Sequence, residues 1–276
     1  KNRGSVKIMF KADYHIHSSF SGDSNENIDD IVKQAIFLKL DEIAITDHLE
    51  YDMLDIDFEK WTLDLDKYKE KIMELKEIYK EKITIRHGVE IGVQPQTREY
   101  LESLVEKYDF DFVIASNHGI NKIDLSNGTI QKDKTRDEIQ KLYFQTILKN
   151  IELYTKYNVW GHLDFITRYG GKEFAGMDLD KNWDLITEIL EKLIEKGKGI
   201  EINTSGYRYN ENRVYPCFEI IKKYVELGGK IITVGSDAHR KEQIAMDFSK
   251  AYEILKELKV EYVTTFEKMK PIFRKI

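Results

Sequence analysis

Residues 230–239 read Lys230-Ile231-Ile232-Thr233-Val234-Gly235-Ser236-Asp237-Ala238-His239. The first half is an apolar, β-branched run of the length of one strand, and such unbroken runs are typical of parallel strands buried on both faces. Two polar side chains, Asp237 and His239, follow directly. Because the loops after parallel strands converge at one end of the sheet, this stretch predicts a strand that carries functional groups at its carboxyl end.

The same pattern recurs along the chain. Further strands are predicted at residues 6–15, 42–46, 83–90, 112–116, 159–164 and 199–203. Apolar residues recur at helical spacing in residues 28–38, 65–79, 98–108, 136–157, 179–196 and 215–227, and a last helix is expected at about 243–258. Seven such α/β units favour a closed, barrel-like sheet ringed by helices. A doubly wound open sheet is the alternative, and periodicity alone does not separate the two.

Composition narrows the class of protein. The 276 residues contain no linker-like stretch and no short repeat, so one domain covering 1–276 is expected. The formal net charge of −6, from 43 basic and 49 acidic side chains, gives no general attraction to nucleic acid or anionic lipid. The apolar runs are far too short for a membrane span, and residues 1–5 lack the apolar stretch of a signal peptide. The lone Cys217 fits a reducing compartment, so a cytoplasmic location is expected, while the oligomeric state is left open.

Six of the seven histidines lie at or just after the end of a predicted strand, as do one glutamate and one aspartate. These residues are His15, His17, His48, Glu90, His118, His162, Asp237 and His239. Side chains alternate along a strand, so His15 and His17 point the same way and can hold one ion together. Imidazole and carboxylate are the ligands that zinc, manganese and iron accept, and two or three such ions can clamp a phosphoryl group and generate hydroxide. The sequence therefore predicts a cluster of divalent metal ions.

Each of these residues also has a structural interpretation. A single histidine at a strand end is often a hydrogen-bonded structural residue, and an acidic residue before a helix is often an N-cap. Asp23, in Ser21-Gly22-Asp23-Ser24, can be a turn or cap residue. His87 is out of phase with Glu90 and is excluded from the site. Six histidines at equivalent positions favour metal binding over chance.

Several short motifs carry a resemblance to a known family. They are Asp13-Tyr14-His15-Ile16-His17-Ser18, Thr46-Asp47-His48, Gly88-Val89-Glu90, Ser116-Asn117-His118, Gly161-His162 and Ser236-Asp237-Ala238-His239. In this order they resemble the motifs of the polymerase and histidinol phosphatase (PHP) superfamily, and the match spans about residues 13–239. The resemblance implies a distorted seven-stranded, TIM-like (β/α)7 barrel and a metal-dependent phosphoesterase.

The resemblance also implies a trinuclear metal site. One ion would bind His15, His17, Glu90 and Asp237, with Glu90 bridging to a second ion on His118 and His162. The third ion would bind Asp23, His48 and His239, and many members of the superfamily carry a histidine at the position of Asp23. The expected cofactors are therefore two to three divalent ions, which can be zinc, manganese or iron because such ligands do not select one metal.

Residues 161–169 and 201–208 resemble the monofunctional histidinol-phosphatase branch. This implies hydrolysis of L-histidinol phosphate to L-histidinol and phosphate, a late step of histidine biosynthesis. Arg168 and Arg208 follow predicted strands, and guanidinium groups pair well with phosphate oxygens, so both are candidate catalytic and substrate-binding residues. Either can instead be an ordinary loop arginine. His239 or Asp23 could protonate or stabilise the leaving alkoxide, and the sequence does not choose between them.

Three alternatives stay open. A PHP phosphoesterase that acts on another small phosphate monoester or a nucleotide would share every ligand. A DNA 3′-exonuclease is disfavoured because the sequence has no basic patch. A non-catalytic, metal-stabilised module would have closed metal coordination instead of an open position. The expected partner is thus a small phosphate monoester, with no membrane and no nucleic acid.

Overall fold

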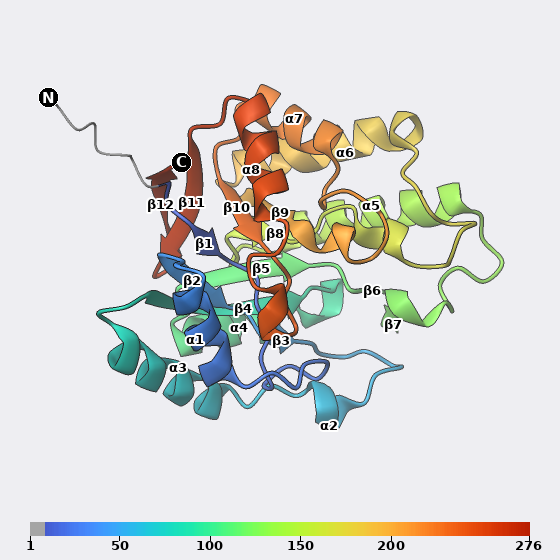
Figure 1. Ribbon diagram of the computed structural model, residues 1–276. Helices are drawn as coiled ribbons and strands as arrows, with labels where there is room; N and C mark the ends of the chain where they lie inside the picture. Colours follow the sequence, from blue (N-terminus) through green and yellow to red (C-terminus); the bar gives the residue numbers. More distant parts are fainter. Residues whose placement is uncertain (1–8) are drawn as a thin grey trace, which may run out of the picture.

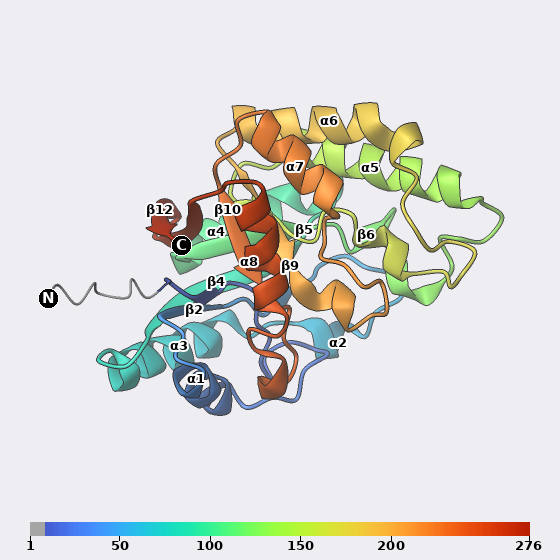
Figure 2. The same cartoon turned by 45° about the horizontal axis from the view of Figure 1, so that its top comes forward.

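A computed structural model describes residues 9–276 of the chain. Its centre is a sheet of parallel strands in the order β1-β2-β4-β5-β8-β9-β10 (Figures 1 and 2). The bounds of these strands are β1 (Ala12–Asp13), β2 (Glu42–Ile45), β4 (Thr84–Gly92), β5 (Phe112–Ser116), β8 (Val159–Trp160), β9 (Gly199–Asn203) and β10 (Ile232–Gly235). A short strand, β3 (His48–Leu49), also pairs with β4.

The two outer strands of this order meet again. The backbone N–H of Tyr14 donates to the carbonyl oxygen of Val234 at 3.0 Å, and Ile16 forms a parallel bridge with Ala238. The sheet therefore closes almost completely into a barrel of seven parallel strands. This confirms the predicted barrel and excludes the open-sheet alternative.

Helices surround the barrel (Figures 1 and 2). Their bounds are α1 (Ile28–Phe37), α2 (Phe58–Trp61), α3 (Leu65–Tyr79), α4 (Arg98–Tyr108), α5 (Arg136–Leu153), α6 (Leu179–Glu195), α7 (Phe218–Glu226) and α8 (Phe248–Glu257). Each of the longer helices buries an apolar face against the sheet or a neighbouring helix, as α6 does with Ile186, Ile189 and Leu193. α5 begins at a capping box in which Thr135 and Glu138 satisfy each other's backbone N–H groups. Across residues 9–276, no helix combines the length and apolar character that crossing a bilayer requires.

Two predicted helix starts were wrong. α7 begins at Phe218 and not at residue 215, because Tyr215 exchanges backbone hydrogen bonds with Asn203 and is followed by Pro216. The residue before a proline is disfavoured in the α-helical conformation. α8 begins at Phe248 and not at residue 243, because Asp247 has a φ of 59° and cannot continue a helix. Part of the first predicted strand, residues 6–8, lies outside the described residues.

Two antiparallel hairpins were not predicted. β6 (Gly119–Ile120) and β7 (Ile123–Asp124) form one directly after β5, and β11 (Tyr262–Glu267) and β12 (Lys270–Lys275) form the other at the end of the chain. Phe266 of β11 packs in an apolar cluster with Phe112 and Val159, the first residues of β5 and β8. The C-terminal hairpin thus covers the amino-terminal end of the barrel interior, and the functional side chains lie at the opposite end.

Candidate metal centre and active-site pocket

The six predicted imidazoles converge at the carboxyl end of the barrel. The ring centroid of His17 lies 4.2 Å from those of His48 and His239. The rings of His118 and His162 lie 5.4 Å apart. Their segments follow five different strands, so only the closed sheet brings them together. The complete group is His15, His17, His48, His118, His162 and His239.

Glu90, on β4, occupies the middle of this group and is fully buried. Its Oε2 lies 3.2 Å from His15 Nε2 and 3.0 Å from His48 Nδ1. Its Oε1 lies 3.0 Å from His162 Nε2 and 3.2 Å from His118 Nε2. Burial by itself raises the pKa of Glu90, but the charges of His15, His118 and His48 outweigh it and hold that pKa well below the usual range. Glu90 is therefore an anion that faces several imidazoles at once.

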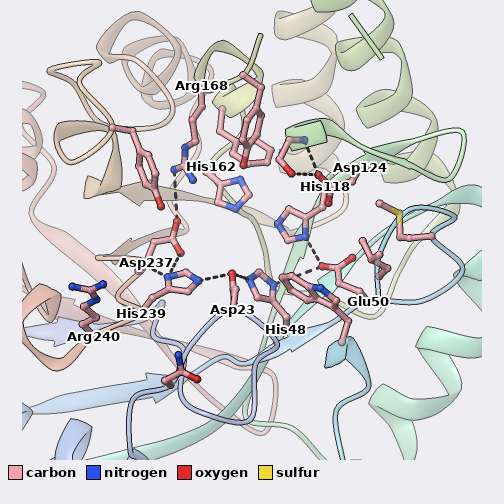
Figure 3. Close-up of a pocket in the computed structure, with 18 of the residues that line it drawn as sticks. Asp23, His48, Glu50, His118, Asp124, His162, Arg168, Asp237, His239 and Arg240 are labelled. Atoms are coloured by element: carbon pink, nitrogen blue, oxygen red, sulfur yellow. Dashed lines mark hydrogen bonds and ion pairs between the residues drawn. The ribbon is translucent and has the colours of Figure 1, made fainter. Parts of the chain in front are cut away.

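Two aspartates complete the group on its open side. Asp237 Oδ1 lies 3.3 Å from His17 Nε2. Asp23 Oδ2 lies 3.0 Å from His239 Nε2 and 3.5 Å from His48 Nε2, so that Asp23 stands between these two rings (Figure 3). Asp237 has a φ of 56°, a left-handed conformation that aspartate tolerates better than most residues. All nine residues predicted as metal ligands thus lie in one cluster.

The donor atoms fit divalent metal ions. Buried polar atoms normally have a hydrogen-bond partner, yet His15 Nε2, His17 Nε2, His48 Nδ1 and Glu90 Oε2 have none. Sets of three ligand atoms lie within 4.8 Å of one another, which is the spacing needed to contact one ion. These sets are His15-His17-Glu90, His15-His162-Asp237, His48-Glu90-His118 and His17-His48-His239.

The protonation of individual imidazoles depends on their neighbours. Burial, together with the charges of His48 and His239, lowers the pKa of His17 to about 3, so His17 is neutral and has a free lone pair. Burial also lowers the pKa of His118, but the carboxylates of Glu50 and Glu90 raise it to about 10. His118 therefore holds a proton that an incoming cation would have to displace.

Buried carboxylates lie behind two of the histidines. Glu201 Oε1 lies 2.5 Å from His15 Nδ1, and Glu50 Oε1 lies 2.5 Å from His118 Nδ1. Glu201 was not among the site residues predicted from the sequence. The alternation of side chains in residues 199–203 was the available signal, because it places Glu201 on the same strand face as Asn203, toward the barrel interior.

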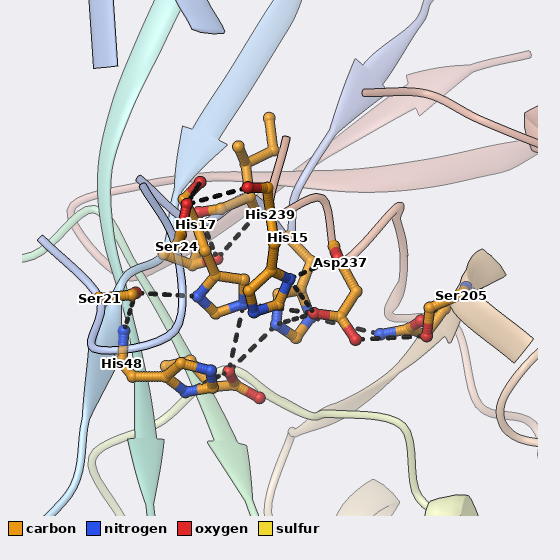
Figure 4. A network of polar contacts seen from close by, with 12 residues as sticks. His15, His17, Ser21, Ser24, His48, Ser205, Asp237 and His239 are labelled. Carbon is orange, nitrogen blue, oxygen red and sulfur yellow. Dashed lines mark hydrogen bonds and ion pairs between the residues drawn. The ribbon is translucent and has the colours of Figure 1, made fainter. Parts of the chain in front are cut away.

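Hydroxyl groups hold the loops that carry the imidazoles (Figure 4). Ser21 Oγ accepts the backbone N–H of His48 at 2.9 Å, donates to Asp47 at 2.6 Å and lies 3.2 Å from His17 Nδ1. Ser205 Oγ donates to Asp237 Oδ2 at 3.2 Å. The polar residues between the motif histidines therefore fix the positions of the loops.

A pocket with a volume of about 750 Å³ opens over this cluster. Arg168 lies in its wall, where its Nη2 donates to Ser205 Oγ at 2.8 Å and lies 3.8 Å from Asp237 Oδ2 (Figure 3). The guanidinium also lies 3.7 Å from the centre of the Tyr209 ring. Arg168 is thus a fixed positive charge beside the predicted ligands.

Arg208 has a different position from the one expected. Its Nη2 donates to the backbone carbonyl oxygens of Ser236 and Asp237, at 2.6 and 2.9 Å. It is not among the residues that line the pocket, and its buried Nη1 has no hydrogen-bond partner. A contact between Arg208 and phosphate stays a prediction.

His87 lies apart from the cluster. Its ring packs between those of Tyr68 and Phe110, with centroids 5.4 and 4.4 Å away. Burial lowers its pKa to about 3, so it is a neutral core residue. This agrees with its exclusion on the basis of strand alternation.

Comparisons with known proteins point to one family. The PHP domain family profile matches residues 13–205. The chain is 33% identical over 263 residues to the histidinol-phosphatase of Lactococcus lactis subsp. lactis, which covers 95% of this chain and 96% of that protein. It is 32% identical over 246 residues to a probable histidinol-phosphatase of Clostridium acetobutylicum, with 88% and 91% covered.

The fold agrees with this match. A crystal structure of histidinol phosphate phosphatase from Lactococcus lactis subsp. lactis, in complex with zinc, L-histidinol and phosphate, superimposes with a TM-score of 0.89. The identity is 32%, and the alignment covers 96% of this chain and 99% of that one. This chain belongs to the PHP domain family and groups within it with the histidinol-phosphatases.

Proposed function

We propose that this chain is a divalent-metal-dependent phosphatase that hydrolyses L-histidinol phosphate to L-histidinol and phosphate. The observation that carries the proposal is the convergence of six imidazoles and three carboxylates beneath a pocket that also contains Arg168. The similar Lactococcus lactis structure, which contains zinc, L-histidinol and phosphate, supports the choice of substrate.

The metal ions would be shared among the clustered residues as the family resemblance implies. His15, His17, Glu90 and Asp237 would hold one ion, and Glu90 would be shared with a second ion on His118 and His162. Asp23, His48 and His239 would hold a third. The contacts of both Glu90 oxygens to imidazoles on two sides support the shared role of this residue. Bound divalent ions would act as Lewis acids on the phosphoryl oxygens and lower the pKa of water.

Charged side chains of the pocket would orient the phosphate monoester. Arg168 is kept in place by Ser205 and Tyr209, and burial does not prevent its charge, because the pKa of Arg168 is raised by Tyr169 and Asp237. A held guanidinium can offer two parallel donors to phosphate oxygens. Arg208 stays a candidate for a second phosphate contact through its Nη1.

A proton is needed on the leaving alkoxide. Asp23 and His239 both face the pocket, and Asp23 Oδ2 lies 3.0 Å from His239 Nε2. While no ion occupies the site that Asp23, His48 and His239 would form, a proton held between these two atoms would be available at the pocket surface. We therefore keep Asp23 and His239 together as the proposed source of this proton.

The pocket suits a small organic phosphate. Its volume of about 750 Å³ falls in the range of about 300–1,000 Å³ that is usual for small-molecule sites. Its rim combines apolar side chains, such as Met53 and Trp61, with the carboxylate of Asp124. We further propose that residues 1–276 act as a single domain in the cytoplasm, in line with a main apolar cluster that includes residues from Ile16 to Val263 and a lone, buried Cys217.

The direct test is phosphate release. Protein stripped of metal with a chelator is supplied with Zn²⁺, Mn²⁺ or Fe²⁺ and given L-histidinol phosphate, a nucleotide or a simple aryl phosphate. We expect metal-dependent release that is fastest with L-histidinol phosphate. Release no faster than from the aryl phosphate would refute the substrate, and faster release from the nucleotide would favour the alternative phosphoesterase. In His15→Ala, metal content and rate should fall together.

A further inference from the structure

Glu201 is a carboxylate enclosed in the barrel, with an exposed fraction of 1%. It is the central residue of β9, and its neighbours leave room for it. A Cβ on Gly235 would lie 2.5 Å from Glu201 Oε1, and a Cβ on Gly161 would lie 3.5 Å from Oε2. The glycine at 235 is therefore what allows a carboxylate to occupy this place.

Both oxygens of Glu201 accept hydrogen bonds. Oε1 lies 2.5 Å from His15 Nδ1, while Oε2 accepts the backbone N–H of His162 at 2.8 Å and Nδ2 of Asn203 at 3.2 Å. Because an ionised carboxylate only accepts, the proton of the first bond sits on His15 Nδ1. Nε2, which lies 3.2 Å from Glu90 and has no hydrogen-bond partner, is then the nitrogen of His15 that an ion can contact.

The second bond holds an unusual backbone conformation. His162 has a φ of 21°, which non-glycine residues rarely adopt. Its N–H is bonded to Glu201, and its ring reaches Glu90 Oε1 at 3.0 Å. One carboxylate therefore supports two imidazoles that approach Glu90 from different strands.

We propose that Glu201 is a positioning residue, which sets the tautomer of His15 and the backbone of His162 so that both imidazoles aim their lone pairs at the ions shared by Glu90. This inference rests on the proposed function in taking His15, His162 and Glu90 as metal ligands. A carboxylate behind a ligand histidine fixes the ring and strengthens the ligand, and its loss lowers metal affinity by about 10- to 100-fold.

The test compares two buried glutamates. Glu201→Gln keeps the shape, but an amide has one acceptor, so it cannot accept from both His15 and His162. Glu42→Gln is the matched control. Glu42 is also 1% exposed, but it lies at the first residue of β2 and bonds to Tyr14 and Arg86 instead of to an imidazole.

Two readouts need no substrate. The first is the dissociation constant for Zn²⁺, from titration of metal-stripped protein against a chromophoric chelator. The second is the chemical shift of the His15 Nδ1–H proton in the zinc-loaded protein, which reports its hydrogen bond to residue 201, from ¹H–¹⁵N NMR of the imidazoles. We expect Glu201→Gln to weaken zinc binding by about 10- to 100-fold and to shift the His15 Nδ1–H signal upfield, because this proton loses its carboxylate acceptor, while Glu42→Gln leaves both unchanged.

Several results would overturn the role of Glu201. Wild-type zinc affinity and an unchanged Nδ1–H signal in Glu201→Gln would do so, as would an equal loss of affinity in Glu42→Gln. If Glu201→Gln does not fold, Glu201→Asp replaces it. This shorter carboxylate cannot reach both partners, so wild-type values in it would equally refute the proposal. If the wild-type protein binds zinc but does not hydrolyse L-histidinol phosphate, only the proposed substrate is contradicted. The effect of Glu201→Gln on zinc binding would still test the role of Glu201.

Discussion

Substitution of Gly235 tests whether activity depends on the exact positions of His15 and Glu201, which pack against this glycine. Gly235 ends β10, beside Tyr14 and His15, which directly follow β1. In Gly235→Ala the new Cβ would lie 2.5 Å from both His15 Cβ and Glu201 Oε1, whereas ordinary contact begins at 3.4 Å. The His15–Glu201 pair would therefore have to move by about 0.9 Å, a shift set by the contact distance alone.

This displacement should affect activity more than folding. A misplacement of about 1 Å in a catalytic constellation can cost about 100-fold in rate, whereas overpacking a core by one methyl typically costs about 1–3 kcal/mol. We expect kcat/KM for L-histidinol phosphate to fall by about 100-fold, with weaker zinc binding. The measurements are steady-state phosphate release, metal content after dialysis and urea unfolding.

Gly199→Ala is the matched control for overpacking. A Cβ on Gly199 would lie 2.3 Å from the Ile231 carbonyl oxygen, so this change crowds the same barrel. Gly199 is the first residue of β9, at the end of the barrel away from the metal centre. Gly199→Ala should therefore lose stability but keep zinc affinity and substrate specificity. Equal kinetic losses in the two variants, or a Gly235→Ala enzyme within threefold of wild type, would refute the reasoning.

Further predictions address other parts of the molecule. Asp23→Ala should lower the number of bound ions per chain, measured by mass spectrometry of metals, because Asp23 lies between His48 and His239; unchanged stoichiometry would exclude it as a ligand. Arg168→Lys should raise KM for the phosphate ester and lower kcat, since a lysine cannot stack on Tyr209 and offer two parallel donors; unchanged kinetics would exclude Arg168 from phosphate binding. Burial lowers the pKa of His87 from 6.5 to about 3, so between these values the unfolded chain binds a proton that the folded chain does not. Stability should therefore fall as the pH falls below about 6.5, by about 1.4 kcal/mol per pH unit, and urea unfolding should show this contribution removed in His87→Leu; identical pH slopes in wild type and variant would contradict it.

The sequence was most informative where one residue type recurs at one structural position. The ends of buried parallel strands can be located from apolar runs, and a histidine at each of several ends has few structural explanations. The cluster around Glu90 was therefore predictable from the sequence alone. The same logic excluded His87, because strand alternation turns its side chain into the helix layer, where it meets Tyr68 and Phe110.

The direction of an individual loop side chain and the presence of very short strands could not be predicted, because the spacing of apolar residues along the sequence does not determine them. Arg208 follows its strand as Arg168 does, yet a backbone turn directs it to the carbonyl oxygens of Ser236 and Asp237. Nothing local distinguishes these two arginines. The hairpin β6–β7, which brings Asp124 to the pocket, consists of strands of two residues, too short to produce a pattern.

The candidate metal centre has to meet two requirements that conflict. Its buried carboxylate must be paired with imidazoles, and the same imidazoles must be able to bind metal. A fully buried carboxylate is costly unless it is paired, and Glu90 meets this need with imidazoles from several loops. The same imidazole nitrogens are the atoms that would bind metal, so protons and ions compete for one set of lone pairs. Metal binding would then release protons and weaken as the pH falls. In the role proposed above, Glu201 would hold the remaining proton on Nδ1 of His15, and Glu50, which lies 2.5 Å from His118 Nδ1, would do the same for His118, so neither glutamate need contact an ion to affect how the cluster exchanges protons for metal.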